Sequence, residues 1–210
     1  MSYTVKEIIY TIQGEGAHAG RPCVLCRFSG CNLWTGREED RAAAICGICD
    51  TDFVGTDGPG GGVYQTPGDL AAAIARCWPP STVHPFVVCT GGEPLLQLDE
   101  PLIAALHGRE FAIAVETNGT MEPPPGIDWI CVSPKAGADR AIHKGDELKL
   151  AFPQDGAPPE EFEALDFRYF YLQPIAGADV KRNTDLAIRY CMEHPRWRLS
   201  LQIHKWLGLP

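Results

Sequence analysis

The sequence lacks a long apolar run, a targeting segment and a surplus of positive charge. No stretch approaches the roughly 20 apolar residues that a membrane-spanning helix requires, and the N-terminal segment MSYTVKEIIY has neither the basic nor the apolar region of a secretory signal. Only 18 Lys and Arg stand against 27 Asp and Glu, and the net charge of −9 argues against binding to the phosphates of nucleic acid. We therefore expect a cytoplasmic protein that acts on a small molecule, with neither a membrane nor a nucleic acid as partner.

Linkers and internal repeats are also absent. The 210 residues, 45% of them hydrophobic, can bury one sizeable core, and we expect a single domain over residues 1–210. Segments rich in β-branched and aromatic residues predict strands at 5–12, 23–29, 86–90, 111–117, 128–133, 147–152, 168–173 and 198–203. Helical patterns with capping residues occupy 66–78, 99–108, 158–165 and 183–194.

This alternation of strands and helices predicts an α/β fold with a parallel sheet, because parallel neighbours need crossover connections. The pattern does not distinguish an open sheet from a closed barrel. In both cases functional sites gather where the strands end and the loops begin. The motifs TGGEP, ETNGT, SPK and QPIAG all follow or end predicted strands, so we expect them to lie close together.

The nine cysteines, an odd number, argue against a disulfide framework in a reducing compartment and favour metal or redox sites. Cys23-x2-Cys26 and Cys46-x2-Cys49, with 19 residues between the pairs, have the spacing of a four-cysteine zinc site. If 23–29 is a strand, however, the side chains of Cys23 and Cys26 point to opposite faces. A thioredoxin-type role for CGIC is weaker, because a loop and not a helix follows the pair. On spacing alone, zinc remains an alternative.

Cys31, Cys46 and Cys49 form a second possible set. Three thiolates can hold a four-iron cluster and leave one iron open for a cofactor. Here the chain resembles the radical S-adenosylmethionine (SAM) enzymes, whose usual CxxxCxxC motif it matches at the closing CxxC but not at the fourteen-residue first gap. Lengthening that gap costs roughly 1.4 kcal/mol of loop-closure entropy, against metal-binding free energies on the order of 10 kcal/mol. Residues 37–44 are rich in helix formers, and a helical turn there would keep the ends of the gap close.

A second motif supports this resemblance. Gly91-Gly92-Glu93-Pro94 follows a predicted strand and resembles the motif with which radical SAM enzymes hold the ammonium group of SAM, although alone it equally suits a tight turn. Further motifs occur in family order across nearly the whole chain and together resemble the 7-carboxy-7-deazaguanine synthase family. They are QGEG (13–16), RFSGCNLW (27–34), CDTDF (49–53), ETNGT (116–120), SPK (133–135) and LQIHKWLG (201–208).

This resemblance implies a fold, a reaction and cofactors. The fold would be a reduced, partial parallel β/α barrel that forms homodimers, with a cluster-binding loop at about 31–50. The reaction would contract the ring of 6-carboxy-5,6,7,8-tetrahydropterin to 7-carboxy-7-deazaguanine, with loss of ammonia, in the biosynthesis of queuosine-type 7-deazapurines. The cofactors would be a [4Fe-4S] cluster, SAM and Mg²⁺, with an electron donor such as flavodoxin or ferredoxin, and they would carry the hard chemistry.

The resemblance also assigns site residues. The pterin would contact Ile12, Gln13, Gly14, Arg27, Thr90, Glu116, His204 and the C-terminal Pro210, whose carboxylate would close over it. SAM would contact Ile48, Asp50, Gly92, Glu93, Ser133, Pro134, Lys135, Gln173, Pro174, Ile175 and Ala176. Cys31, Cys46 and Cys49 would bind the cluster and Thr51 the Mg²⁺, with Asp50 or Asp52 as alternative Mg²⁺ ligands.

Two other functions fit parts of the pattern. A radical SAM activase that makes a glycyl radical on a partner protein would need an open mouth, whereas QGEG and the C-terminal LQIHKWLG predict a closed pocket for a small molecule. A zinc-stabilised binding module, the alternative from another class, would hold colourless zinc on four thiolates instead of a brown, oxygen-sensitive cluster.

Overall fold

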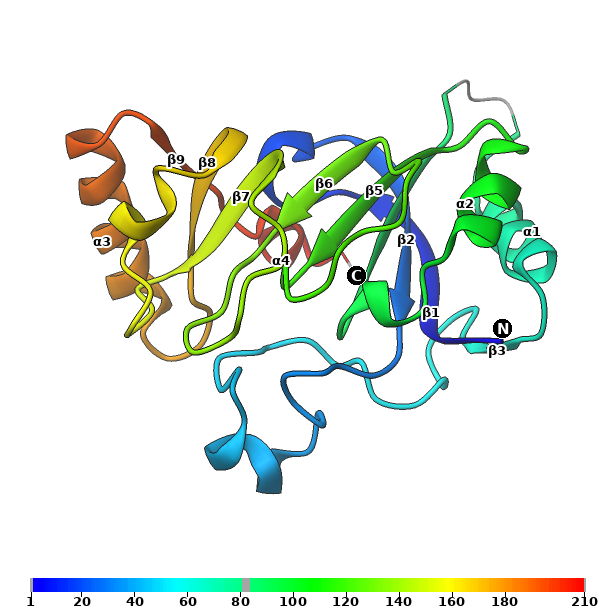
Figure 1. Ribbon diagram of the computed structural model, residues 1–210, viewed down its shortest axis with the longest axis horizontal. Coiled ribbons are helices and arrows are strands. Elements are labelled where there is room, and N and C mark those ends of the chain that lie inside the picture. The colour runs from blue at the N-terminus through cyan, green and yellow to red at the C-terminus, as the bar shows by residue number, and fades with distance from the viewer. Residues whose placement is uncertain (1, 81–83, 210) are drawn as a thin grey trace.

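A single mixed sheet organises the chain in the computed structural model, which describes residues 2–80 and 84–209 (Figure 1). In this part of the chain nine strands lie in the order β3-β1-β2-β4-β5-β6-β7-β8-β9. The strands are β1 (Tyr3–Ile12), β2 (Pro22–Phe28), β3 (Gly62–Tyr64), β4 (Phe86–Gly91), β5 (Ala112–Thr117), β6 (Trp129–Val132), β7 (Lys144–Phe152), β8 (Asp166–Pro174) and β9 (Trp197–Leu199). Because β3 and β9 lie at opposite edges, the sheet is open, as in a reduced barrel.

The predicted α/β class with a parallel sheet is confirmed for β2 and β4 to β9, which all pair in parallel. The prediction is wrong for β1, which runs antiparallel to both β2 and β3. Connection length explains the difference, because residues 13–21 are fewer than the dozen or so that a parallel crossover requires.

Helices join several of the strands. They are α1 (Pro67–Cys77), α2 (Glu100–His107), α3 (Val180–Glu193) and α4 (Ile203–Leu207), with 3₁₀ turns η1 (Gly16–His18), η2 (Glu38–Ala43), η3 (Pro94–Leu96) and η4 (Pro159–Phe162). Thr66 and Asp99 cap α1 and α2 as predicted, because their side chains accept the backbone N–H groups of Asp69 and Leu102. None of the helices in the described ranges is both long and apolar enough to cross a membrane.

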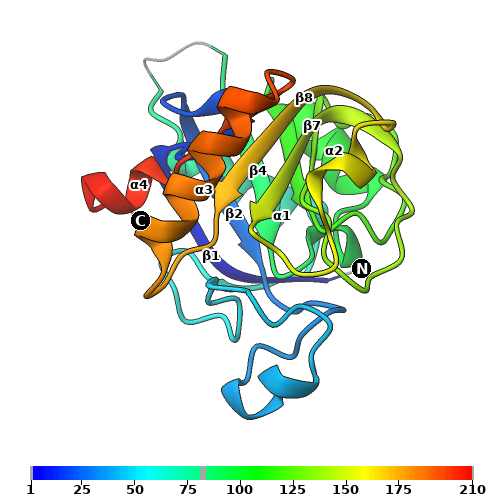
Figure 2. The ribbon, with the colours of Figure 1, turned by 90° about the vertical axis from the view of Figure 1, so that its left-hand side faces the viewer.

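The three longer helices cover one face of the sheet, with α1 and α2 at one end and α3 against β8 at the other (Figures 1 and 2). Their apolar residues, such as Leu70, Ile74 and Leu102, are fully or almost fully buried in the main core with the strand side chains that face them. On the other face, a smaller apolar cluster contains Cys23, Phe86, Val88 and Ala114. The face that carries this smaller cluster is not covered by α1, α2 or α3, so it leaves room for a cavity.

Three predicted elements differ from the structure. The strand expected at 198–203 ends at Leu199, and α4 begins at Ile203. Pro174 at the end of β8 has no N–H to extend the ladder with β9, and Ile203 instead donates its N–H to the carbonyl of Gly14 (3.0 Å). The segments 158–165 and 37–44 form only the 3₁₀ turns η4 and η2.

Candidate active site

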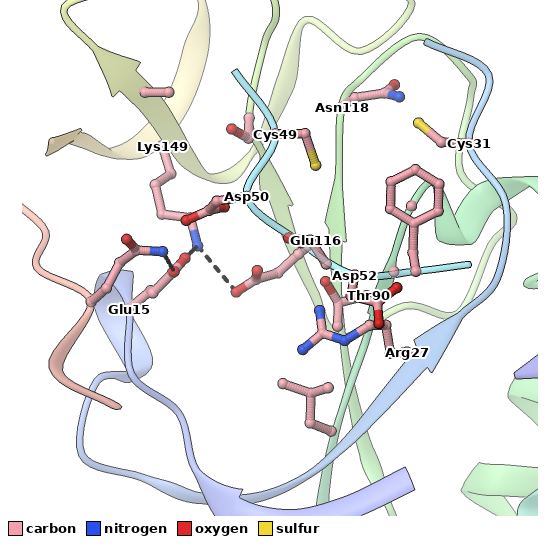
Figure 3. A pocket seen from close by; sticks show the side chains of 18 of the residues that line it. Glu15, Arg27, Cys31, Cys49, Asp50, Asp52, Thr90, Glu116, Asn118 and Lys149 are labelled. Carbon is pink, nitrogen blue, oxygen red and sulfur yellow. Dashed lines mark hydrogen bonds and ion pairs between the residues drawn. The ribbon is translucent and has the colours of Figure 1, made fainter. Parts of the chain in front are cut away.

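A cavity of about 420 Å³ opens at the carboxyl ends of the parallel strands (Figure 3). Its walls come from β1, β2, β4, β5, β7 and β8, from the segment that follows β6, from the loop that follows β2 and from the C-terminal segment. The predicted site residues that line it are Ile12, Gln13, Gly14, Arg27, Cys31, Cys46, Ile48, Cys49, Asp50, Thr51, Thr90, Gly92, Glu116, Ser133, Lys135, Gln173 and His204. Glu93, Pro134, Pro174, Ile175 and Ala176 lie outside this lining, and Pro210 lies outside the described residues.

The three candidate cluster ligands lie on the loop between β2 and β3, which projects from the sheet with η2 at its tip (Figures 1 and 2). Cys31 Sγ accepts a hydrogen bond from the backbone N–H of Leu33 (3.4 Å). The N–H of Cys46 donates to the carbonyl of Leu33 (3.3 Å), and Arg41 Nη1 donates to the carbonyl of Cys49 (3.0 Å). The ends of the long gap therefore meet at Leu33, although a 3₁₀ turn takes the place of the expected helix.

The arrangement fits an iron–sulfur cluster better than a single metal ion. Within residues 2–80 and 84–209, no three Cys, His, Asp or Glu side chains converge closely enough to hold one ion. Cys31, Cys46 and Cys49 nevertheless line the same cavity, as ligands to different irons of one cluster must. Burial raises the pKa of the Cys31 and Cys46 thiols, and a bound metal would reverse this effect because a coordinated thiol is deprotonated.

The four-cysteine zinc alternative fails on geometry. Cys23 and Cys26 lie in β2 and are both fully buried, but on opposite faces of the sheet. Cys23 packs with Phe86 and Val88 in the smaller cluster, whereas Cys26 packs in the main core. The predicted opposite orientation is confirmed, and these two thiols cannot bind the same ion.

The glycine turn after β4 brings the loops after β2 and β4 into contact. Gly92 donates its N–H to the carbonyl of Phe28 (3.2 Å), and Glu93 donates its N–H to the carbonyl of Gly30 (2.9 Å). A methyl group at Gly92 would overlap the carbonyl oxygen of Gly30 and lie 2.9 Å from Cys31 Cβ. Glycine is therefore required here for the cysteine loop to approach the turn.

Glu93 itself is fully buried, and three protein donors meet its carboxylate. The N–H of Leu95 (2.9 Å) and the hydroxyl of Thr117 (2.7 Å) donate to Oε1, and the N–H of Asn118 (2.8 Å) donates to Oε2. Burial raises the pKa of Glu93, although these donors lower it. The carboxylate thus joins the turn after β4 to the loop after β5, and its contacts are with protein.

Two polar pairs occupy the wall formed by β1, β2, β4 and β5. Gln13 Nε2 donates to Glu116 Oε1 (2.8 Å). Arg27, which pairs in register with Thr90, donates from Nε to Glu7 Oε1 (2.7 Å). That contact uses one of the five N–H groups of the guanidinium, and Figure 3 shows Arg27 beside Thr90 and Asp52 at the cavity. Glu7 was not predicted, because an exposed acid and a strand partner look alike in the sequence.

A buried charge cluster forms another wall and was also missed. Lys149 Nζ contacts Glu15 Oε2 (2.5 Å) and Glu116 Oε1 (3.2 Å), as the dashed lines of Figure 3 show. Gln202 Nε2 donates to Glu15 Oε1 (3.0 Å). The sequence did contain a sign of this cluster. Polar and apolar residues alternate at the start of ELKLAF (147–152), which puts Glu147 and Lys149 on one face of an otherwise apolar strand.

The SPK motif after β6 places a half-buried cation near the cysteine loop. Lys135 Nζ donates to the carbonyl (2.6 Å) and to the hydroxyl (2.7 Å) of Ser133. Burial lowers the pKa of Lys135, although the Cys46 and Cys49 thiols close to it raise it. Ser133 and Lys135 face the cavity and can meet an anionic group there, whereas Pro134 does not.

The C-terminal segment closes one side of the cavity. Besides the bond from Ile203 to Gly14, a methyl group at Gly14 would overlap the His204 ring, so α4 lies directly over Gly14. Burial lowers the pKa of His204, which favours the neutral imidazole. Lys205 Nζ contacts Asp50 Oδ2 (2.5 Å), and this ion pair ties α4 to the residue after Cys49. The tail and the cysteine loop therefore meet across the cavity.

An open, mostly parallel sheet, three cysteines on one loop and a glycine turn at the same cavity define the class of the radical SAM enzymes. No protein-family model matches the chain. The crystal structure of QueE from Escherichia coli superposes with a TM-score of 0.68 at 29% identity, over 96% of this chain and 94% of that chain. The chain is also 62% identical to a 7-carboxy-7-deazaguanine synthase of Caulobacter vibrioides and 59% identical to one of Bordetella pertussis, over the full length of each. It belongs to the 7-carboxy-7-deazaguanine synthase family.

Proposed function

We propose that this protein is a radical SAM carbon–nitrogen lyase that converts 6-carboxy-5,6,7,8-tetrahydropterin to 7-carboxy-7-deazaguanine, with loss of ammonia. The observation that carries the proposal is that one cavity collects Cys31, Cys46 and Cys49 together with the polar side chains of Gln13 and Glu116. Cys31, Cys46 and Cys49 would hold the cluster, which together with SAM would supply a 5′-deoxyadenosyl radical for hydrogen-atom abstraction from the pterin. The protein binds, orients and shields the reactants.

Residues at the ends of β4, β6 and β8 suit SAM. The close approach of Gly92 to the cysteine loop leaves its backbone beside the position of a cluster held there. Ser133 and Lys135 offer a hydroxyl and an ammonium for a carboxylate, and Gln173 lines the same cavity near the end of β8. Glu93 would act indirectly, because its contacts hold the turn and the loop that contains Asn118.

Residues of β1, β2 and β5 suit a planar, polar heterocycle with a carboxylate. Arg27 uses its Nε–H for Glu7, and the two Nη groups of the guanidinium can form a two-point contact with a carboxylate. Gln13 and Glu116 present amide and carboxylate groups to N–H and carbonyl groups of a ring. His204 would contribute to this enclosure from α4, which lies over Gly14, and we propose Pro210 as a further contact to the heterocycle.

For Mg²⁺ we propose Thr51 as the protein ligand. The neighbouring carboxylates are both engaged by cations, since Asp50 contacts Lys205 and Asp52 contacts Lys6 (2.8 Å). Thr51 lines the cavity between them. Mg²⁺ commonly takes one or two protein oxygens and completes its octahedron with substrate and water.

The remaining assignments also follow from the family. We propose that residues 1–210 act as one radical SAM domain, with 31–50 as the cluster-binding loop, in a homodimer in the cytoplasm. A small electron-transfer protein such as flavodoxin or ferredoxin would reduce the cluster. The activase alternative loses its support, because the relatives are synthases and α4 covers the cavity that a protein loop would have to enter.

Anaerobic turnover tests the proposal. Reconstituted and reduced protein receives SAM, Mg²⁺ and 6-carboxytetrahydropterin, and mass spectrometry follows the deazapurine product. We expect product from the wild type and none from the triple variant Cys31→Ala/Cys46→Ala/Cys49→Ala. Cys191→Ala, which removes a thiol of α3 that is absent from the cavity lining, is the matched control and should retain activity. A protein that cleaves SAM but leaves the pterin intact would contradict the proposed substrate.

A further inference from the structure

Lys149 is a buried cation between two carboxylates of the cavity wall. Its side chain is 5% exposed, and those of its partners Glu15 and Glu116 are 14% and 23% exposed. The partners come from distant parts of the chain, Glu15 from the connection between β1 and β2 and Glu116 from β5, whereas Lys149 lies in the middle of β7. Two strands and the connection between β1 and β2 thus meet at one ammonium group (Figure 3).

The hydrogen bonds give the two carboxylates defined orientations. Gln13 and Lys149 both donate to the same oxygen of Glu116, Oε1, so among these contacts of the described residues Oε2 is the oxygen that can accept from a ligand. Glu15 receives Lys149 at Oε2 and Gln202 at Oε1. Both carboxylates line the cavity, so their lone pairs form part of its acceptor surface.

Four other titratable groups lie around Lys149, and none of them balances the negative charge of the Glu15 and Glu116 carboxylates. They are Glu147 on the same strand, Cys131 on β6, Lys135 beyond β6 and His204 on α4. Burial raises the pKa of the Glu147 carboxyl and of the Cys131 thiol, which disfavours further negative charge. Lys149 is therefore the cation that contacts both carboxylates in the described part of the chain.

We propose that Lys149 is a positioning residue that holds Glu15 and Glu116 as oriented acceptors for the N–H edge of the bound heterocycle. This inference deepens the proposed function and rests on it for the identity of the ligand. Without the ammonium, two carboxylates would share a buried site, an arrangement that disfavours the ionisation of one of them. A protonated carboxyl would offer a donor where the ligand needs an acceptor.

The pKa of Glu15 supports this role. Burial alone would raise it, but the charge of Lys149 and hydrogen bonds from Lys149, Gln202 and Gln173 lower it to about 2. Glu15 of the wild type therefore keeps its charge throughout the range from pH 6 to 8. In a variant without the cation, Glu15 must ionise at a higher pH, so the affinity for the pterin should improve as the pH rises.

The test compares Lys149→Met with the wild-type holoenzyme. We measure kcat and KM for 6-carboxytetrahydropterin between pH 6 and 9, and SAM cleavage in the absence of pterin. A charged hydrogen-bond partner commonly accounts for a factor of about 30 in affinity. We expect KM to rise about 30-fold at pH 7 and to fall again toward pH 9, with SAM cleavage changed less than about twofold.

Three further variants separate positioning from a structural role. Lys149→Arg keeps the charge and should recover part of the loss in KM. Glu15→Gln/Lys149→Met removes the charge conflict and should have a lower KM than Lys149→Met, with a weaker dependence on pH. Lys144→Met is the matched control, because Lys144 is an exposed lysine at the start of the same strand, and its kinetics should equal those of the wild type.

Several results would overturn the inference. An unchanged KM for Lys149→Met, a pH profile parallel to that of the wild type, or an equal loss of SAM cleavage would each exclude a positioning role. If the wild type forms no product, the proposed function fails, and a crystal structure of the Lys149→Met holoprotein still tests the geometry. We expect the carboxylates of Glu15 and Glu116 to move apart in it, and unchanged positions would refute the role of the cation.

Discussion

Replacing Glu93 should lower the stability of the protein and not only its affinity for a cofactor. The GGEP resemblance assigned this carboxylate to the ammonium of SAM, but the structure surrounds it with the N–H of Leu95, the hydroxyl of Thr117 and the N–H of Asn118. Glu93→Ala would leave these donors without an acceptor at a site with no exposure to solvent. Each buried donor without an acceptor lowers the free energy of unfolding by about 1–3 kcal/mol.

The expected magnitudes separate two substitutions. Water can enter the space left by Glu93→Ala and satisfy some of the donors, so we expect a loss of about 4 kcal/mol in the free energy of unfolding. Glu93→Gln retains one oxygen for Leu95 and Thr117 but turns its NH₂ toward the N–H of Asn118. That single conflict should cost about 1–3 kcal/mol, and the removal of a buried charge offsets part of it.

Urea unfolding followed by circular dichroism measures both losses. Glu193→Gln, an exposed carboxylate at the end of α3, is the matched control and should lie within about 0.5 kcal/mol of the wild type. Equilibrium binding of SAM to the reconstituted proteins provides the second measurement. If Glu93→Gln keeps the wild-type stability and loses SAM affinity, the carboxylate contacts the cofactor and the reasoning is refuted.

Other parts of the site lead to separate expectations. Cys31→Ala should lose most of the bound iron and its brown absorbance, whereas Cys23→Ala should keep both, and equal iron contents would show that the ligand set is wrong. A peptide added to the C-terminus should lower kcat/KM about tenfold more than the same peptide at the N-terminus, because it displaces α4 from the cavity; equal activities would exclude a role for the tail. Because the pKa of Glu15 is lowered to about 2, its ion pair should stabilise the protein above pH ~4 and lose that effect as the pH falls toward 2. The unfolding free energies of wild type and Lys149→Met should therefore differ by about 3–5 kcal/mol at pH 7 and converge in acid, and a constant difference would contradict this account.

Local patterns predicted most strands and the edge at which the site lies. β-branched runs identified β4 and β5, and polar residues at their ends predicted that Thr90 and Glu116 would share a cavity, which they do. The alternation of side chains along a strand was enough to place Cys23 and Cys26 on opposite faces. These features depend on a few neighbouring residues.

The missed features depend on contacts between distant residues. Lys149 and Glu15 are 134 positions apart, so no local pattern shows that they form a pair. The direction of β1 depends on the length of its connection, and the end of β9 depends on Pro174 in its neighbour. The burial of Glu93 under Thr117 likewise appears only once β4 and β5 are packed.

Because the cysteine loop is closed at Leu33, the number of residues between Cys31 and Cys46 does not determine how close these two cysteines lie. The hydrogen bond from Cys46 to Leu33 joins the base of the loop, while η2 extends beyond it with no buried residue. Arg41 must stay, because it donates to the carbonyl of Cys49, but the exposed positions Ala42 and Ala43 can accept a fluorescent or spin label without a change in the cavity walls. A reporter there would lie on the same loop as the metal ligands and could follow cluster assembly in the intact protein. By the same logic, cysteine spacing is a poor guide for finding related chains, because a proteome search that fixes the first gap at three residues overlooks loops that are closed at their base.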